Sequence, residues 1–248
     1  MKRWILLRGL MRDSRHWGAF PAMLEQTLGA AEVICIDLPG NGTRYRWPSP
    51  ASISELVAAC RSDPQLLGCR DRSGIVAMSL GAMVATEWAA QHPEEIGALV
   101  LINTSLRPFS PLWHRLRPQN YPAILHLLLR RALDTEVERA VLAMTSRRCV
   151  DDSELLADWC RWRAAMPVSR SNVLRQVLAA ARYRAPNEAR VSTLLLASEG
   201  DSLVAADCSR EIARRWRVPL AVHPDAGHDL PLDDPQWVLN QIRFWQAT

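Results

Sequence analysis

The chain is almost devoid of lysine: one Lys and 29 Arg make up its 30 basic residues, against 26 acidic ones, for a net charge of +4 over 248 residues. A nucleic-acid-binding protein would show a concentrated basic stripe with a matching motif, and no such motif is present. No apolar run reaches the length of a membrane span either. We therefore expect neither a nucleic-acid partner nor a membrane partner.

Export signals and metal-binding patterns are also missing. The first residues, MKRWILLRGL, place two basic side chains before an apolar stretch that ends at Arg8 and Gly9, too early for the core of a signal peptide. The six cysteines form no CxxC pair and no Cys/His pattern with metal-ligand spacing. They are Cys35, Cys60, Cys69, Cys149, Cys160 and Cys208. We expect reduced, mostly buried thiols in a cytoplasmic protein, with no metal and no organic cofactor.

Six short apolar runs predict strands, and segments with helical spacing lie between them. The strand runs are WILLRG (4–9), EVICIDLPG (32–40), GIVAMS (74–79), ALVLINTS (98–105), STLLLASEGD (192–201) and VPLAVHPDAGH (218–228). The helical segments cover residues 17–29, 52–67, 80–91, 205–217 and 235–246. Because the strand runs are nearly continuous in apolar residues, we expect helices on both faces of the sheet. The alternation predicts an α/β fold with a doubly wound, mostly parallel six-stranded sheet.

Residues 107–190 interrupt this alternation. They contain no convincing strand, and the stretches 121–133, 134–146, 151–166 and 169–184 have helical spacing. Asp134 and Asp151 suit the N-cap position of two of these helices. We therefore predict a core formed by residues 1–106 and 191–248, with residues 107–190 as a helical cap inserted between two strands.

The predicted cap is basic and rich in large apolar residues. Its 15 Arg against eight Asp and Glu give a balance of +7, so the remainder of the chain carries −3. A basic lid could steer acidic substrates, but we favour a solvated helical face with acidic partners one turn away. Trp113, Trp159, Trp162 and residues 124–129 allow either an apolar acyl pocket or, more commonly for such side chains, the packed interior of the cap.

Three side chains capable of joint catalysis follow three different predicted strands. They are Ser79, Asp201 and His228, in that chain order. Ligands bind at the carboxyl ends of the strands in open α/β sheets, and this order is one of the known orders of the hydrolytic triad. Taken singly, each residue has a plain structural explanation as a turn or solvated loop residue. Their joint placement favours a triad.

Each member of this triad would have a distinct role. Ser79 would attack a carbonyl carbon once His228 takes its proton, and Asp201 would accept the other ring N–H and stabilise the imidazolium. Small neighbours at Ala77 and Gly81 suit the sharp strand-to-helix turn that such a serine requires. The oxyanion would be bound by two backbone N–H groups, those of Leu80 at the start of the helix and Leu10 in the loop after the first strand. These residues predict acyl transfer through an acyl-enzyme.

Other acids and histidines near these positions are weaker candidates. Asp225 and Asp229 flank His228 too closely to reach its ring easily, Asp207 suits a surface helix, and Asp37 reads as a structural turn residue. His16 and Trp17 lie on the loop near the expected oxyanion site, and we predict that they contact the substrate.

Five segments resemble those of a known superfamily. RGLMRDSRHW (8–17) resembles its strand–HG–loop–Trp segment, IDLPGNG (36–42) its DLPGHG loop, AMSLGA (77–82) its nucleophile elbow, SEGDSLV (198–204) its acid loop and AGHDLPLDDP (226–235) its histidine loop. The chain is thus similar to the α/β-hydrolase fold superfamily, of the capped serine esterase type. The resemblance implies the same roles for Ser79, Asp201, His228, Leu10 and Leu80.

The sequence departs from the family pattern at two positions. Ala77 replaces the first glycine of the elbow, and Arg8 stands where the family commonly has His. Arg8 beside the oxyanion loop could bind a substrate carboxylate or pair with a neighbouring acid. The chain also resembles a reduced core without the first two strands of larger members.

These observations predict a serine hydrolase that cleaves a carboxylic ester or thioester of a small to medium substrate. A lyase or synthase acting on a carboxylate-bearing metabolite with the same triad is an alternative, as is a non-catalytic ligand receptor of the same fold. Acyl length and alcohol group depend on the geometry of the cap.

Overall fold

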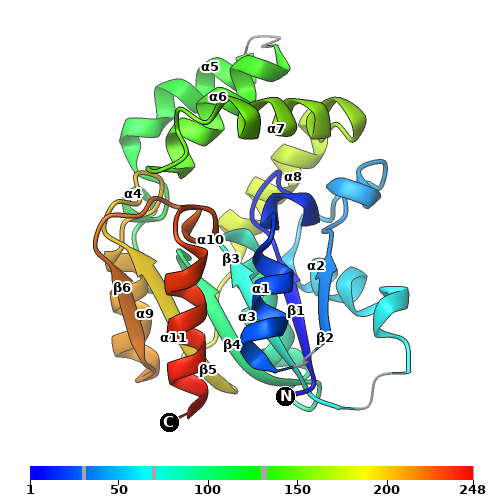
Figure 1. Cartoon of the computed structure of the whole chain (residues 1–248), viewed down its shortest axis with the longest axis vertical. Helices are drawn as coiled ribbons and strands as arrows, with labels where there is room; N and C mark the ends of the chain where they lie inside the picture. The colour runs from blue at the N-terminus through cyan, green and yellow to red at the C-terminus, as the bar shows by residue number, and fades with distance from the viewer. Residues whose placement is uncertain (30–31, 69–70, 130–132, 248) are drawn as a thin grey trace.

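The computed structural model describes residues 1–29, 32–68, 71–129 and 133–247, with the backbone alone for residues 127–129. A six-stranded sheet forms its centre (Figure 1). Its strands are β1 (Arg3–Leu7), β2 (Glu32–Ile36), β3 (Ser73–Met78), β4 (Ile96–Ile102), β5 (Ser192–Ser198) and β6 (Leu220–His223). Their order is β2-β1-β3-β4-β5-β6, and every neighbouring pair is parallel. The predicted α/β fold with six strands is therefore confirmed.

Helices cover both faces of the sheet, as the continuous apolar strands predict. Helices α1 (Phe20–Leu28) and α11 (Pro235–Ala247) pack on one face, and α2 (Ile53–Arg61), α3 (Leu80–Gln91) and α9 (Asp207–Trp216) pack on the other. Successive side chains of a strand point to opposite faces. In β1, accordingly, Trp4 and Leu6 join the cluster that contains α1 and α11, whereas Ile5 and Leu7 join the other. The fold is doubly wound.

One glycine lets the sheet accommodate a tryptophan. A Cβ placed on Gly74 of β3 would lie 2.6 Å from the Trp4 ring, which is completely buried beside it. The pairing of Trp4 with Gly74 in the β1–β3 register explains this contact. Any larger residue at position 74 would displace the ring, so this glycine is a packing requirement of the sheet centre.

Residues 107–190, which we call the insertion, lie between β4 and β5. They form α4 (Leu112–Arg115), α5 (Tyr121–Leu129), α6 (Asp134–Thr145), α7 (Ser153–Ala165) and α8 (Arg170–Arg182). Figure 1 shows α5, α6 and α7 across the top of the molecule, above the edge at which the strands end. The boundaries of a separate cap domain stay a prediction.

Local helix starts differ from the sequence prediction by one residue. The N-cap of α7 is Asp152, whose carboxylate accepts from Leu155 N, and not Asp151. Asp134 is the first residue of α6 and Leu133 is its N-cap. The four-residue helices α4 and α10 (Leu230–Asp233) were not predicted, and neither were the 3₁₀ turns at Ser14–Trp17, Gly42–Arg44, Pro64–Leu66 and Pro118–Asn120.

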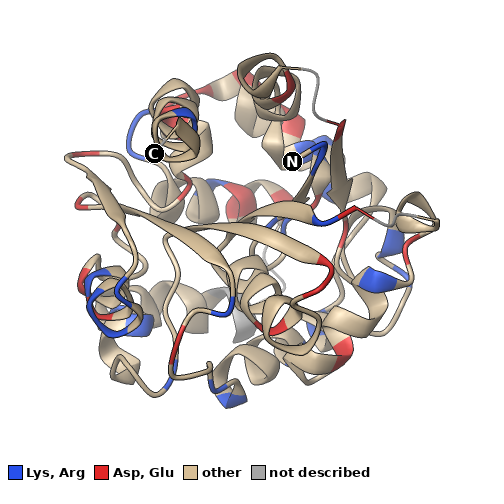
Figure 2. Ribbon diagram, turned by 90° about the horizontal axis from the view of Figure 1, so that it is seen from below, with Lys and Arg blue, Asp and Glu red and all other residues tan. Residues whose placement is uncertain are grey.

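Charged residues lie mainly on the helices and loops, and the strands contain few of them (Figure 2). No helix in the described part of the chain combines the length and the apolar character needed to cross a bilayer. Cys69 lies outside the described residues, and the other five cysteines are free thiols. Burial raises the pKa of Cys60 to about 12 and that of Cys208 to about 11, which makes both poor nucleophiles.

Candidate active site

Ser79 occupies the sharp turn between β3 and α3. Its backbone has φ 53° and ψ −115°, a conformation that L-residues rarely adopt and that the surrounding structure must enforce. Two hydrogen bonds fix the turn: Ser79 N donates to Ile102 O (3.0 Å), and Thr104 Oγ1 donates to Ser79 O (3.1 Å). The serine remains partly exposed at the edge where the strands end.

Small residues let the loop after β1 approach this turn. A Cβ on Gly81 would lie 2.5 Å from Leu7 O, and a Cβ on Gly9 would lie 3.2 Å from Ser79 Cβ. Leu10 follows directly after this close approach, and Leu80 opens α3. Among the hydrogen bonds of the described residues, none is donated by the backbone N–H of Leu10 or Leu80. Both groups are therefore available at the turn, and their role as oxyanion donors stays a prediction.

His228 and Asp201 form a buried pair. His228 Nδ1 lies 2.7 Å from Asp201 Oδ2, and the two side chains are 3% and 1% exposed. The second oxygen of Asp201 accepts from the backbone N–H groups of Leu203 (2.8 Å) and Val204 (2.9 Å), which fixes the carboxylate. Asn103 Nδ2 donates to His228 O (2.8 Å) and holds the histidine loop against β4. Hydrogen bonds to Asp201 and to His228 therefore fix the orientation of the pair.

The other candidate acids have different partners. Asp225 pairs with Arg148, Asp207 with Arg210, and Asp229 with Arg8. Asp37 accepts from Ser14 N (2.7 Å) and Thr43 N (2.9 Å), as expected for a structural turn residue. Within the described chain, Asp201 hydrogen-bonds to His228, and none of these four acids does.

Ser79 and His228 line one cavity of about 350 Å³. The insertion contributes most of its apolar wall: Leu116, Ile124, Val137, Val141, Met144, Val168, Val173, Leu174 and Val177. The side chains of residues 127–129 in the Leu-rich run lie outside the described structure. None of Trp113, Trp159 and Trp162 lines the cavity; Trp159 is buried and Trp113 is mostly exposed. The wall is therefore aliphatic rather than aromatic.

Arg8 lines the cavity, but its charge is already paired. Its Nη1 lies 3.0 Å from Asp229 Oδ1, its Nη2 bonds to Asp229 Oδ2, and both side chains are 3% exposed. Burial alone would raise the pKa of Asp229, yet the Arg8 charge and hydrogen bonds hold it below its ordinary value. Of the two explanations that the sequence left open, the structure shows pairing with a neighbouring acid.

His16 and Trp17 do not line the cavity. Trp17 stacks on Phe20 with 5.4 Å between ring centroids, and the Arg8 guanidinium lies 4.8 Å from a Trp17 ring centroid. His16 is buried in edge contacts with Trp159 (5.4 Å) and Trp162 (5.2 Å). Their predicted contact with substrate therefore has no support in the shape of the cavity.

Sequence reasoning missed a buried ion pair between the core and the insertion. Arg12 Nη1 lies 2.6 Å from Glu138 Oε2 in α6, and the Arg12 guanidinium stacks over the Trp159 ring of α7 at 4.1 Å. Arg163 Nη1 reaches the second oxygen of Glu138 at 3.3 Å. No motif links residues 126 positions apart, so spacing carried no signal for this contact.

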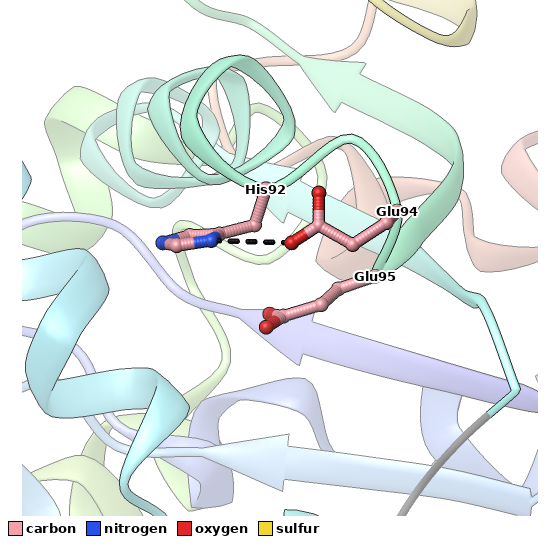
Figure 3. Close-up of side chains that lie close together, drawn as sticks. All are labelled: His92, Glu94 and Glu95. Atoms are coloured by element: carbon pink, nitrogen blue, oxygen red, sulfur yellow. Dashed lines mark ion pairs between the residues drawn. The ribbon is translucent and has the colours of Figure 1, made fainter.

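One group in the described part of the chain has the spacing of a metal site, and it lies far from Ser79 along the sheet. Figure 3 shows His92, Glu94 and Glu95 at the loop that enters β4, so at the opposite end of the strands. Glu95 already accepts from Arg61 Nε (3.0 Å) and Trp88 Nε1 (2.7 Å). Its carboxylate is committed to these donors, and the group is explained as an ion-pair cluster.

The parallel sheet and the serine turn define an α/β hydrolase. The sequence profile of the "Alpha/beta hydrolase family" matches residues 4–241, and the chain therefore belongs to that family. Among curated proteins it is 33% identical over 102 residues to the "Biotin biosynthesis bifunctional protein BioHC" of Teredinibacter turnerae. It is also 33% identical over 94 residues to the "Pimeloyl-[acyl-carrier protein] methyl ester esterase" of Chromobacterium violaceum.

These relatives are matched over limited lengths. The stretches cover 41% and 37% of this chain but 17% and 34% of the two relatives. Solved structures match nearly the whole chain: a thermophilic esterase from Thermogutta terrifontis has TM-score 0.77, 20% identity and coverage of 100% of this chain and 90% of that one. A hydrolase from Pseudomonas aeruginosa has TM-score 0.76, 18% identity and coverage of 99% and 90%. At such identities the likeness establishes the fold.

Proposed function

We propose that the protein is a serine hydrolase that cleaves a carboxylic ester or thioester through an acyl-enzyme, with Ser79, His228 and Asp201 as its triad. The observation that carries this proposal is the strained Ser79 turn opening on the same cavity as His228, whose other ring nitrogen is held by Asp201 at 2.7 Å. A serine in this conformation costs free energy, and catalysis gives that cost a reason.

The proposed reaction has two halves. His228 Nε2 takes the proton of Ser79 Oγ as that oxygen attacks the carbonyl carbon, while Asp201 stabilises the imidazolium that forms. The N–H groups of Leu10 and Leu80 bind the negatively charged oxygen of the tetrahedral intermediate. The ester bond then breaks, His228 returns the proton to the leaving alcohol or thiol, and water releases the acid by the same steps.

The cavity favours an apolar acyl group. Its wall carries Val137, Val141 and Val173 from α6 and α8, and its volume of about 350 Å³ suits a small to medium substrate. In this proposal the insertion acts as a cap that determines the acyl group. The esterase names of the Chromobacterium and Thermogutta proteins support ester cleavage rather than another use of the triad.

The lyase alternative rested on Arg8 and on the arginine-rich cap as groups that would suit a substrate carboxylate. Asp229 already occupies both outer nitrogens of the Arg8 guanidinium, and Arg163 of the insertion, which lines the cavity, pairs with Asp134 and Glu138. Esterase activity is therefore the function that we propose.

Activity-based labelling tests the proposal directly. The wild-type protein should react with a fluorophosphonate probe and hydrolyse p-nitrophenyl acyl esters with a burst of nitrophenol equal to the enzyme concentration. Ser79→Ala should abolish both. A folded wild-type protein that neither reacts with the probe nor releases nitrophenol would contradict the proposal and favour the lyase or the receptor.

A further inference from the structure

The ion pair between Arg8 and Asp229 joins the two loops that carry the proposed catalytic groups. Arg8 lies two residues before Leu10, and Asp229 directly follows His228. The contact is bidentate and both partners are buried, so that solvent does not compete for it. Positions 221 residues apart in the chain are thereby locked together at the cavity wall.

Arg8 has a third contact, with the nucleophile strand. Its Nη1 also lies 3.6 Å from Sδ of Met78, the residue before Ser79. The Trp17 ring also packs against the guanidinium, with 4.8 Å between Arg8 Cζ and the ring centroid. One planar cation thus touches the segments that present the oxyanion donor, the nucleophile and the base, and its orientation is fixed.

From this geometry we infer that Arg8 and Asp229 are positioning residues, which set the distance between the Leu10 N–H and the His228 imidazole. The inference rests on the proposed esterase function and deepens it. A shift of about 1 Å between catalytic groups costs about 100-fold in rate. Loosening this tether should therefore lower kcat, whereas KM, which depends on the aliphatic wall, should change little.

The pair also affects the charge around His228. Besides Arg8 and Asp229, the charged groups around the histidine loop are Asp201, which pairs with His228, and Asp233 of α10, which accepts from Gly227 N (2.6 Å). The charge of Arg12 acts on Asp229, and Arg117 Nη1 donates to Asp201 O (2.8 Å). Across the cavity lie Arg163 and Arg170. Removing Arg8 alone would leave a bare carboxylate beside the imidazole, whereas removing the Asp229 charge alone would leave a bare guanidinium.

Three variants separate positioning from charge: Arg8→Met, Asp229→Asn and the double variant Arg8→Met/Asp229→Asn. Each should lower kcat for p-nitrophenyl butyrate by about 10- to 100-fold, with KM within about threefold of wild type. The acidic limb of the kcat/KM profile should move to higher pH in Arg8→Met and to lower pH in Asp229→Asn. In the double variant the limb should return to the wild-type position while kcat stays low. The double variant buries no unpaired charge, so its folding does not carry the cost of the single variants.

The burst amplitude of each variant gives the concentration of enzyme with a reactive Ser79. Dividing the steady-state rate by this concentration gives a kcat that excludes misfolded protein. Arg8→Lys keeps the charge but not the bidentate fork, and it should retain the wild-type pH profile with part of the kcat. The matched control is Arg44→Met, which breaks a buried pair with Asp63 away from the cavity and should leave kcat per burst unchanged.

Different results would overturn the positioning role of Arg8 and Asp229 and the proposed esterase function. Wild-type kcat in the double variant, or acidic limbs that move in the same direction in both single variants, would overturn the inference while the esterase stands. A wild-type protein without labelling or burst would overturn the proposed function, and the inference with it.

Discussion

Arg12, in the loop after β1, and Glu138, in helix α6, form a buried ion pair that joins the sheet to the insertion. Their side chains are 8% and 2% exposed, and Arg12 Nη1 lies 2.6 Å from Glu138 Oε2. Two cations, Arg12 and Arg163, share this one carboxylate. The contact therefore holds the wall of the cavity over the strand ends.

Removing this carboxylate should destabilise the protein strongly. Glu138→Gln leaves the buried Arg12 guanidinium without its anion and leaves Arg163 with Asp134 as its carboxylate partner, and breaking a buried pair in this way costs about 3–5 kcal/mol. Urea unfolding followed by tryptophan fluorescence would measure the loss, since Trp159 packs on Arg12. Asp158→Asn, which breaks a surface pair with Arg161 one turn away in α7, is the control and should cost less than about 1 kcal/mol. Equal losses of unfolding free energy in the two variants would show that burial of the Arg12–Glu138 pair does not add to stability.

Asp201 should be essential for turnover but not for folding. Asp201→Asn keeps the shape of the side chain but replaces one acceptor oxygen with a donor, so that His228 is held in the wrong tautomer, an effect of about 10⁴-fold on kcat. The measurement is hydrolysis of p-nitrophenyl esters, with circular dichroism to confirm the fold. Asp207→Asn changes a surface acid that pairs with Arg210 and should retain full activity. A kcat for Asp201→Asn within tenfold of wild type would contradict its role.

How much of the fold the sequence predicts depends on the length of its apolar runs and helical repeats. The continuous apolar runs are long enough to show burial on both faces, and all six predicted strands are present. Helix α4, with four residues, is too short to show helical spacing. At the start of α7, two adjacent aspartates both suit an N-cap, and only the backbone conformation selects Asp152.

Some contacts of the candidate site could likewise be predicted from the sequence, and others could not. Asp201 and His228 follow neighbouring strands, β5 and β6, so their proximity follows from the topology of a parallel sheet. The partners of Arg8 and Arg12 depend on the course of loops and on where the insertion packs, which local sequence does not encode. His16 illustrates the limit: it was predicted near the oxyanion site as a substrate contact, but its ring makes edge contacts with Trp159 and Trp162 of α7.

The buried His16 should make stability depend on pH. Burial, together with the charge of Arg12, lowers the pKa of His16 from 6.5 to about 4. Between these values the unfolded chain binds the proton and the folded chain does not, so the free energy of unfolding falls as pH is lowered, by about 3 kcal/mol in total. Urea titrations at pH 7, 5.5 and 4.5 would show this, and His16→Gln should remove that part of the pH dependence. Parallel pH dependences for the two proteins would contradict the assignment.

Gly81 should tolerate no side chain. A methyl group there would lie 2.5 Å from Leu7 O, at the end of β1, and 2.6 Å from Arg8 O, in the loop that carries Leu10. Gly81→Ala must push this loop away from Ser79, and we expect a loss of about 1–3 kcal/mol in stability and at least about tenfold in kcat. Gly97→Ala is the control, because its added methyl meets the flexible end of Met1 and the Arg72 side chain instead of the backbone. Unchanged kcat in Gly81→Ala would mean that the loop can shift without effect on the reaction.

The acyl preference should respond to the volume of one wall residue. Val137, in α6, lines the cavity and is 7% exposed, so a larger side chain there must take space from the substrate. Val137→Phe should shift the optimum of kcat/KM across p-nitrophenyl esters toward shorter chains, and Val137→Ala should shift it toward longer ones, by one or more methylene groups at about 0.8 kcal/mol each. Val150→Phe places the same ring on an exposed position of the insertion that does not line the cavity, and its chain-length profile should match wild type. If the Val137 variants keep the wild-type profile, the acyl group binds outside the aliphatic wall, and the insertion does not determine the substrate.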